Sequence, residues 1–90
     1  MVNFEITLLE AAHKRSIFNK SEILKSNLCG CFSCLKIYPS AEVKEWIDEE
    51  EGKEHTPLCP YCDIDSVIGD ASLFPITDIE FLKAMKKHWF

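Results

Sequence analysis

Five cysteines between positions 29 and 62 are the residues of this chain whose type and spacing could do chemistry. Four of them form two C-x2-C pairs, Cys31 with Cys34 and, 24 residues further on, Cys59 with Cys62. Thiolates separated by two residues can hold one metal ion from a single tight turn, and two such turns supply the four ligands of a tetrahedral site. The spacing therefore predicts one structural Zn²⁺ held by both pairs.

Cys29 is left over when the two pairs bind a metal. It could serve in place of Cys31 as a permanent or transient ligand, or it could be a spare thiol packed in the first turn. It could also be a redox-sensing thiol, because a nearby metal or helix start lowers the pKa of a cysteine. We favour the packed thiol. His13 and His55 are reserve ligands, and for His13 we favour a solvated position near the end of a helix.

Four thiolates close the coordination of zinc, whereas a catalytic zinc keeps one position open and is usually held by three ligands rich in histidine. The sequence therefore predicts no catalytic residues and no enzyme. A distant alternative is a relative of the treble-clef nucleases with His55 as the base. Those enzymes need a further metal-binding histidine on the following helix, and residues 63–68 contain none.

Length and charge limit the class of protein and its partners. A chain of 90 residues forms one small domain, which has little apolar surface to bury and gains from a metal staple. The formal net charge is −5, whereas nucleic-acid-binding domains normally present a basic face. The charge favours a protein partner. The alternative is nucleic-acid or regulatory binding through Lys14, Arg15, Lys20 and the face formed by residues 83–87.

We expect a cytoplasmic protein with no membrane partner. No charged segment followed by an apolar run opens the sequence, and no apolar stretch approaches the ~20 residues of a membrane span. Thiols stay reduced in the cytosol, so paired cysteines there more often bind metal than form disulfides. The odd cysteine count argues against a disulfide framework, and the second C-x2-C argues against a thioredoxin-like redox motif.

The elements that position the cysteines follow from hydrophobic periodicity. Apolar residues at helical spacing predict a helix over residues 3–18, begun by Asn3 or by a Thr7–Glu10 capping box. A second capping signature, Asn19 followed by Glu22, opens a short helix over residues 19–25. Together these helices form an N-terminal segment, residues 1–27.

The rest of the chain alternates between strand and helix signals. Residues 35–38 have strand character, and residues 40–47 predict a helical turn with one buried face. Acidic residues after the second cysteine pair predict a short helix over residues 62–68. A Thr77–Glu80 capping box predicts a C-terminal helix within residues 76–90.

This order predicts an α+β fold with a small zinc-bound core, residues 28–70. A helix that starts at the second cysteine pair is typical of a treble clef, which we favour, and a second free hairpin there is typical of a zinc ribbon. Asp63 follows the second pair at a position that often needs a left-handed backbone, which Asp tolerates better than most residues.

Four segments carry a signature: Cys29-Gly-Cys-Phe-Ser-Cys-Leu-Lys36, Glu45-Trp-Ile-Asp48, Leu58-Cys-Pro-Tyr-Cys-Asp-Ile-Asp-Ser-Val-Ile-Gly-Asp-Ala71 and Phe74-Pro-Ile-Thr77. The signature resembles a family of small, uncharacterised bacterial cytoplasmic proteins, and the resemblance extends over residues 20–90. Asp63 departs from the family pattern, in which we expect glycine. The resemblance implies a cytosolic zinc-type domain and no particular activity.

An acidic stretch, residues 48–54, offers a docking site for a basic partner. Its candidate interaction residues are Glu49, Glu50 and Glu51, and the loop from Gly69 to Pro75 is a second candidate surface. A solvated hairpin tip is the simpler account of the acidic stretch. With the closed metal site, these features predict a non-catalytic, zinc-stabilised protein-interaction or adaptor domain.

Overall fold

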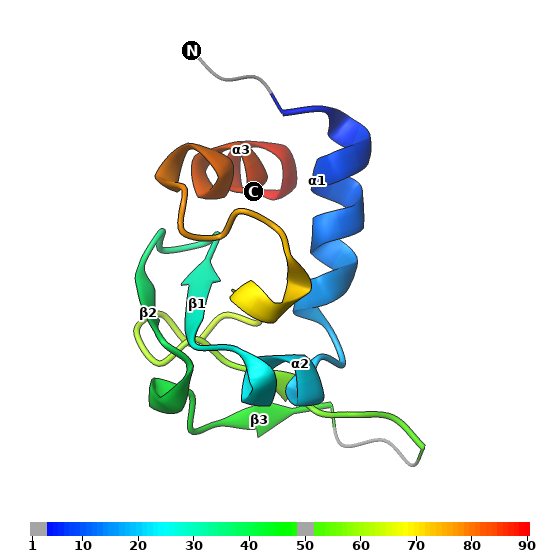
Figure 1. Ribbon diagram of the computed structural model, residues 1–90, viewed down its shortest axis with the longest axis vertical. Helices are drawn as coiled ribbons and strands as arrows, with labels where there is room; N and C mark the ends of the chain where they lie inside the picture. The colour runs from blue at the N-terminus through cyan, green and yellow to red at the C-terminus, as the bar shows by residue number, and fades with distance from the viewer. Residues whose placement is uncertain (1–3, 49–51) are drawn as a thin grey trace.

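Helices packed around two small antiparallel sheets make up the described chain, residues 4–48 and 52–90 of the computed structural model (Figure 1). The helices are α1 (Ile6–His13), α2 (Lys20–Lys25) and α3 (Ile79–Trp89). The strands are β1 (Leu28–Cys31), β2 (Ile37–Pro39), β3 (Trp46–Ile47), β4 (Thr56–Pro57) and β5 (Val67–Gly69). Short 3-10 turns cover Lys14–Ser16, Ser40–Glu42 and Asp70–Ser72. The predicted α+β class is confirmed.

Strand β1 is the centre of the larger sheet, whose strand order is β2-β1-β5. It pairs antiparallel with both neighbours, so that Cys29 lies opposite Tyr38 of β2 and opposite Gly69 of β5. Because side chains alternate along a strand, Cys29 and Cys31 point to one face of the sheet and Gly30 points to the other.

Two hydrophobic clusters lie on opposite faces of this sheet. The first joins α1 and α3 to the sheet and contains Leu9, Ala12, Phe32, Ile68, Ile76, Phe81, Leu82 and Met85. The second contains Ile23, Cys29, Cys31, Tyr38, Val43, Cys59 and Val67. Gly30 lets the first cluster approach β1 closely, since a Cβ at this position would lie 2.8 Å from the carbonyl oxygen of Ile76.

The N-terminal helix is shorter than the expected span of residues 3–18. Helix α1 ends at His13 and passes into a 3-10 turn, and Ile17 then takes an extended backbone, which stops the helical run. No side chain caps the described start of α1, so the Thr7–Glu10 capping box is wrong. The alternative cap, Asn3, lies outside the described residues.

Helix α2 lies where the second helix was predicted, and Asn19 precedes it. The Asn19 side chain does not cap the helix. It donates instead to the carbonyl oxygens of Arg15 (2.6 Å) and Val67 (3.2 Å), which ties the helix to strand β5. Glu22 forms an ion pair with Arg15 at 3.5 Å. Asn19 and Glu22, which were predicted to cap the helix, therefore make contacts with other parts of the chain instead.

The short helix expected over residues 62–68 is wrong. The chain leaves the second cysteine pair through a turn and enters β5 at Val67. All three residues of β5 are buried, and their backbone pairs with β1. The sheet therefore satisfies the polar backbone groups that a helix would otherwise have satisfied. The preference for a treble clef depended on that helix.

The helical turn expected over residues 40–47 is correct only in its first half. A 3-10 turn covers Ser40–Glu42, after which the chain extends into β3. Strand β3 pairs with β4, with Trp46 opposite Pro57 and Ile47 opposite Thr56. This ribbon holds the two ends of the acidic stretch together.

The C-terminal helix is present but begins later than its predicted cap. Helix α3 starts at Ile79, and the Asp78 carboxylate accepts a hydrogen bond from the Glu80 N–H at 3.0 Å. Asp78 is therefore the N-cap, and the Thr77–Glu80 capping box is wrong. Near the end of the helix, the Trp89 indole N–H donates to the Leu9 carbonyl oxygen at 3.3 Å, which joins α3 to α1.

Candidate metal centre

The two C-x2-C segments fold into equivalent turns. In each turn the residue after the second cysteine donates its N–H to the carbonyl oxygen of the first cysteine, Leu35 to Cys31 and Asp63 to Cys59, both at 2.9 Å. Leu35 and Asp63 both adopt the left-handed conformation, with φ of 66° and 60°. The left-handed backbone predicted at Asp63 is confirmed.

The sheet brings the two turns to the same place. The first turn connects β1 to β2, and its Cys31 N–H donates to the Lys36 carbonyl oxygen at 3.0 Å. The second turn is closed by the Cys59 N–H, which donates to the Ile64 carbonyl oxygen at 3.0 Å. It then leads into β5, whose Val67 lies opposite Cys31 of β1. Pairing of β1 with β5 thus holds the second turn beside the first.

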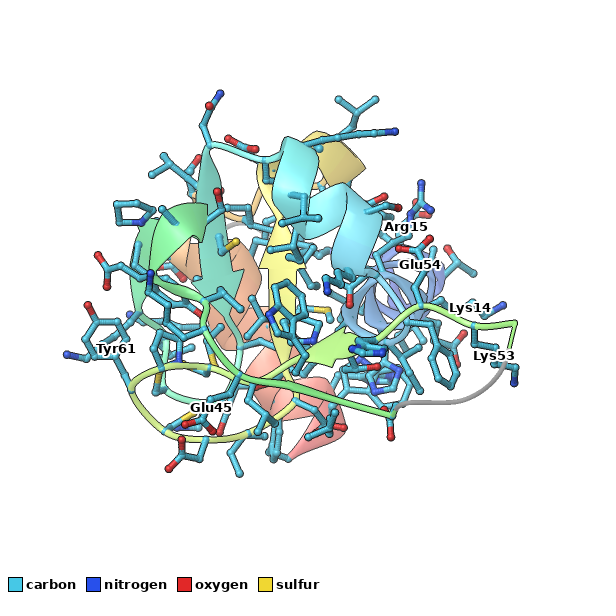
Figure 2. The ribbon with its side chains drawn as sticks, turned by 90° about the horizontal axis from the view of Figure 1, so that it is seen from below. Lys14, Arg15, Glu45, Lys53, Glu54 and Tyr61 are labelled. Atoms are coloured by element: carbon cyan, nitrogen blue, oxygen red, sulfur yellow. The ribbon has the colours of Figure 1, made fainter. Side chains whose placement is uncertain are left out.

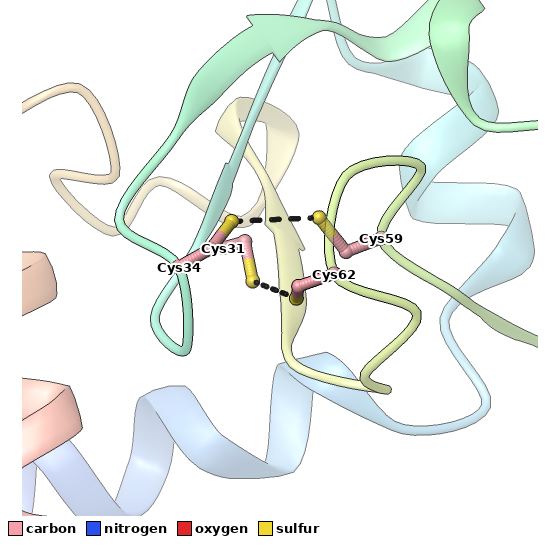
Figure 3. A group of neighbouring side chains, drawn as sticks. All are labelled: Cys31, Cys34, Cys59 and Cys62. Atoms are coloured by element: carbon pink, nitrogen blue, oxygen red, sulfur yellow. Dashed lines mark hydrogen bonds between the residues drawn. The ribbon is translucent and has the colours of Figure 1, made fainter.

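The four paired cysteines come together as one group of sulfur atoms (Figure 3). All four Sγ atoms lie within 4.8 Å of one another. Two contacts cross between the turns, Cys31 to Cys62 and Cys34 to Cys59, each at 3.7 Å. A Zn–S bond of ~2.3 Å in a regular tetrahedron separates the sulfurs by about 3.8 Å. The group is therefore compatible in size with a site for one metal ion.

Backbone N–H groups point at these sulfurs. The Ser33 N–H donates to Cys31 Sγ and the Tyr61 N–H donates to Cys59 Sγ, each at 3.4 Å. Each donor lies two residues after its cysteine, so the two turns repeat the same arrangement. Hydrogen bonds of this kind favour the thiolate, which is the form that binds metal.

Burial opposes thiolate charge at all four sites, and at three of them the pKa is raised overall. It raises the pKa of Cys31, Cys34 and Cys62, although hydrogen bonds from backbone N–H groups partly offset it. At Cys59 the same burial is outweighed by hydrogen bonding from the Tyr38 hydroxyl and from backbone N–H groups, so the pKa is lowered. A divalent cation would supply the missing positive charge, and the donor set fits such an ion.

Two hydroxyl groups lie beside the sulfurs of Cys31 and Cys59, and no sequence motif predicts either. The Ser66 Oγ is 3.0 Å from Cys31 Sγ, and both residues are buried. The Tyr38 hydroxyl is buried and makes no hydrogen bond of ordinary geometry to a described residue, yet it is close enough to Cys59 to lower the pKa of that thiol.

Cys29 and the reserve ligands lie outside the four-sulfur group. Cys29 is fully buried in the second hydrophobic cluster, and burial, with a further contribution from Asp70, raises its pKa to about 12. The structure thus places Cys29 as a packed thiol. His13 stacks on Trp89 with ring centroids 4.0 Å apart, and the backbone carbonyl of His55 accepts the Lys20 N–H at 3.2 Å.

The acidic candidates Glu49, Glu50 and Glu51 lie outside the described residues. Beyond them, the Glu54 carboxylate accepts hydrogen bonds from the N–H (2.5 Å) and the hydroxyl (3.0 Å) of Ser21 at the start of α2. Those bonds lower the pKa of Glu54. Figure 2 shows Glu54 on the same side of the molecule as Arg15. The described part of this region therefore carries charges of both signs.

Comparison with protein-family models, with curated proteins and with solved structures finds no match to this chain. The resemblance to a family of small bacterial cytoplasmic proteins therefore stays a prediction. Within residues 4–48 and 52–90, none of the helices has the length and apolar character needed to cross a bilayer. The structure itself shows a small α+β protein in which four cysteine sulfurs lie close enough together to be compatible with a metal site.

Proposed function

We propose that this chain is a small, non-catalytic domain that is stabilised by one zinc ion and binds another protein in the cytoplasm. The observation that carries the zinc proposal is the group of four sulfurs, all within 4.8 Å, supplied by two equivalent turns from distant parts of the sequence. Thiolate ligands in a tetrahedron suit Zn²⁺, and four of them leave no position for a catalytic water. These properties support a structural role for the metal.

A zinc-ribbon-like core describes this arrangement better than a treble clef. Each cysteine turn adjoins a strand of the same sheet, the first through β1 and β2 and the second through β5. A treble clef would need a helix at the second turn, and the described chain has a strand there. The metal would then join the ends of strands that the sheet already pairs.

The metal is tested by elemental analysis of protein purified without a metal-affinity tag. We expect about one zinc per chain in the wild type, loss of zinc and of cooperative unfolding in Cys59→Ser, and retention of both in Cys29→Ala. The matched control matters because Cys29 is as buried as Cys59 but lies outside the sulfur group. Wild-type protein that folds without metal would overturn the proposal.

The loop from Gly69 to Pro75 is the interaction surface with the strongest structural support. Leu73 is 92% exposed and has a left-handed φ of 69°. The Ser72 hydroxyl fixes this conformation by donating to the Gly69 carbonyl oxygen (2.7 Å) and accepting the Phe74 N–H (3.2 Å). Strained backbone positions cluster at binding and other functional sites, so the exposed, left-handed Leu73 supports a binding role for this loop.

The surface is tested by capturing partners from a bacterial extract with zinc-loaded protein. We expect one partner to be lost with Leu73→Ala and kept with Ile6→Ala, a matched change of an exposed apolar residue on α1. Changing Glu49, Glu50 and Glu51 together to lysine tests the acidic stretch. Capture that survives Leu73→Ala but not this triple change would move the surface to that stretch. Nucleic-acid binding that weakens steeply with salt would support the alternative function.

A further inference from the structure

The four sulfurs of the candidate metal centre are not equivalent. Cys31 and Cys59, the first cysteines of their turns, have 0% exposure, whereas Cys34 and Cys62 are only partly buried. The group therefore has an inner pair, Cys31 with Cys59, and an outer pair, Cys34 with Cys62. Solvent molecules and reagents reach the outer pair first.

Ser66 provides a hydrogen-bond donor to one inner sulfur. Its Oγ lies 3.0 Å from Cys31 Sγ in a buried environment. A metal-bound sulfur carries no proton, so in this contact the serine hydroxyl must donate. The backbone holds the serine in place, because the Ser66 carbonyl oxygen accepts the Phe32 N–H at 3.1 Å. Phe32 belongs to the first cysteine turn, so donor and acceptor are fixed to each other.

Tyr38 stands in the same relation to the other inner sulfur. It packs in one cluster with Cys31 and Cys59, and its buried hydroxyl has no partner of ordinary geometry among the described residues. Buried hydroxyl groups are rarely left unpaired, because desolvation is costly without a hydrogen bond. Among the cysteines of this cluster, Cys59 is the one that interacts most strongly with the Tyr38 hydroxyl.

We propose that the hydroxyl groups of Ser66 and Tyr38 donate to the metal-bound thiolates of Cys31 and Cys59, and that the site opens from the outer pair. This inference rests on the proposed zinc site. Four thiolates around one divalent ion leave an excess of negative charge, and hydroxyl donors reduce it at the inner sulfurs. The outer sulfurs keep more of their nucleophilic character and are also more exposed. Electrophiles therefore react with Cys34 and Cys62 first, and the zinc is then released.

The donors are tested with Ser66→Ala and Tyr38→Phe, and zinc affinity is measured by competition with a chromogenic chelator. We expect each change to weaken zinc binding by about 10- to 100-fold, as for other residues that hydrogen-bond to metal ligands. The matched controls are Ser33→Ala, whose contact with Cys31 is made by the backbone N–H, and Tyr61→Phe, whose hydroxyl bonds to Glu42. Affinities unchanged by the first two substitutions would overturn the inference.

Substitution of Co²⁺ for zinc separates hydrogen bonding from a merely structural role. Loss of a donor to sulfur raises the energy of the sulfur electrons, so the thiolate-to-cobalt charge-transfer band moves to longer wavelength. We expect this shift in Ser66→Ala and Tyr38→Phe and none in the controls. A band that stays in place in all four variants would show that the hydroxyls do not touch the metal-bound sulfurs.

The order of opening is tested on the wild-type protein, so the result does not depend on whether a variant folds. Zinc-loaded protein is treated with less than one equivalent of iodoacetamide, whose iodide is displaced by the attacking sulfur, and the modified cysteine is located by peptide mapping. We expect modification at Cys34 or Cys62 together with zinc release. Equal or preferred modification of Cys31 and Cys59 would overturn this inference alone, whereas protein without metal would overturn the zinc site itself.

Discussion

Replacing Leu73 by glycine should make the domain more stable. A residue with a Cβ in the left-handed conformation costs about 1–2 kcal/mol, and Leu73 has φ of 69°. Glycine removes that cost, but its greater freedom in the unfolded chain lowers the stability of the domain by about 0.5–1 kcal/mol. The side chain is 92% exposed, so its removal sacrifices little burial. The net expectation is a gain of about 0.5–1 kcal/mol, or about 2–8 °C in Tm.

The measurement is reversible unfolding of zinc-loaded protein at a fixed excess of zinc, because bound metal adds to apparent stability. Leu73→Ala is the control that keeps the Cβ and its strain, and we expect its free energy of unfolding to stay within about 0.5 kcal/mol of the wild type. Both variants should lose the captured partner. Stability and binding would then move in opposite directions in the glycine variant, as expected of a residue kept for recognition.

A Leu73→Gly variant that unfolds more easily than the wild type would refute this reasoning. It would mean that the leucine side chain is buried in solution or that the loop does not hold a left-handed residue. Equal gains in the glycine and alanine variants would remove backbone strain as the cause. Either result would also weaken the case for the loop as the interaction surface.

Three further predictions concern close packing at Gly69, the cap of α3 and the metal. Gly69→Ala should destabilise the domain by about 1–3 kcal/mol in chemical denaturation, because the new Cβ would lie 2.1 Å from Ser26 Oγ. An unchanged free energy of unfolding would contradict the close packing of α2 on β5. Asp78→Ala should lower the free energy of unfolding by about 1 kcal/mol through loss of the α3 cap, while Asp78→Asn should keep most of it; equal losses would mean that the cap is not used. Removal of zinc with a strong chelator should abolish cooperative thermal unfolding, and an unchanged transition in calorimetry would argue against a structural metal.

The metal-binding pattern was predictable because it depends on spacing within short segments. Two cysteines separated by two residues and followed by a left-handed residue specify a turn that is local in sequence, and the structure has this turn twice. Spacing favoured Cys29 as the cysteine left over but did not exclude it as a replacement for Cys31, since the two are alternate residues of β1 and share one face of the sheet. Only the register of the sheet separates their roles.

The failed prediction of a helix over residues 62–68 shows that pairing with distant residues can outweigh local preference. Residues 63–66 have the composition of a first helical turn, but the short apolar run Val67–Gly69 can be buried only beside β1. A buried run of three residues carries no period that distinguishes strand from helix. Ser66 and Tyr38 were missed for a related reason, because only the folded chain brings their hydroxyl groups close to the cysteine sulfurs.

The central position of β1 also sets an order of assembly. Strand β1 has one partner that follows directly in the chain, β2, and one from the far half, β5. The first hairpin closes a short loop and can form early, whereas the β1–β5 pair must close a long one at a greater cost in entropy. Two thiolates of the early hairpin can already hold a metal ion, and the second cysteine turn would then bind to that ion and draw β5 into place. We therefore expect zinc to speed refolding as well as to slow unfolding.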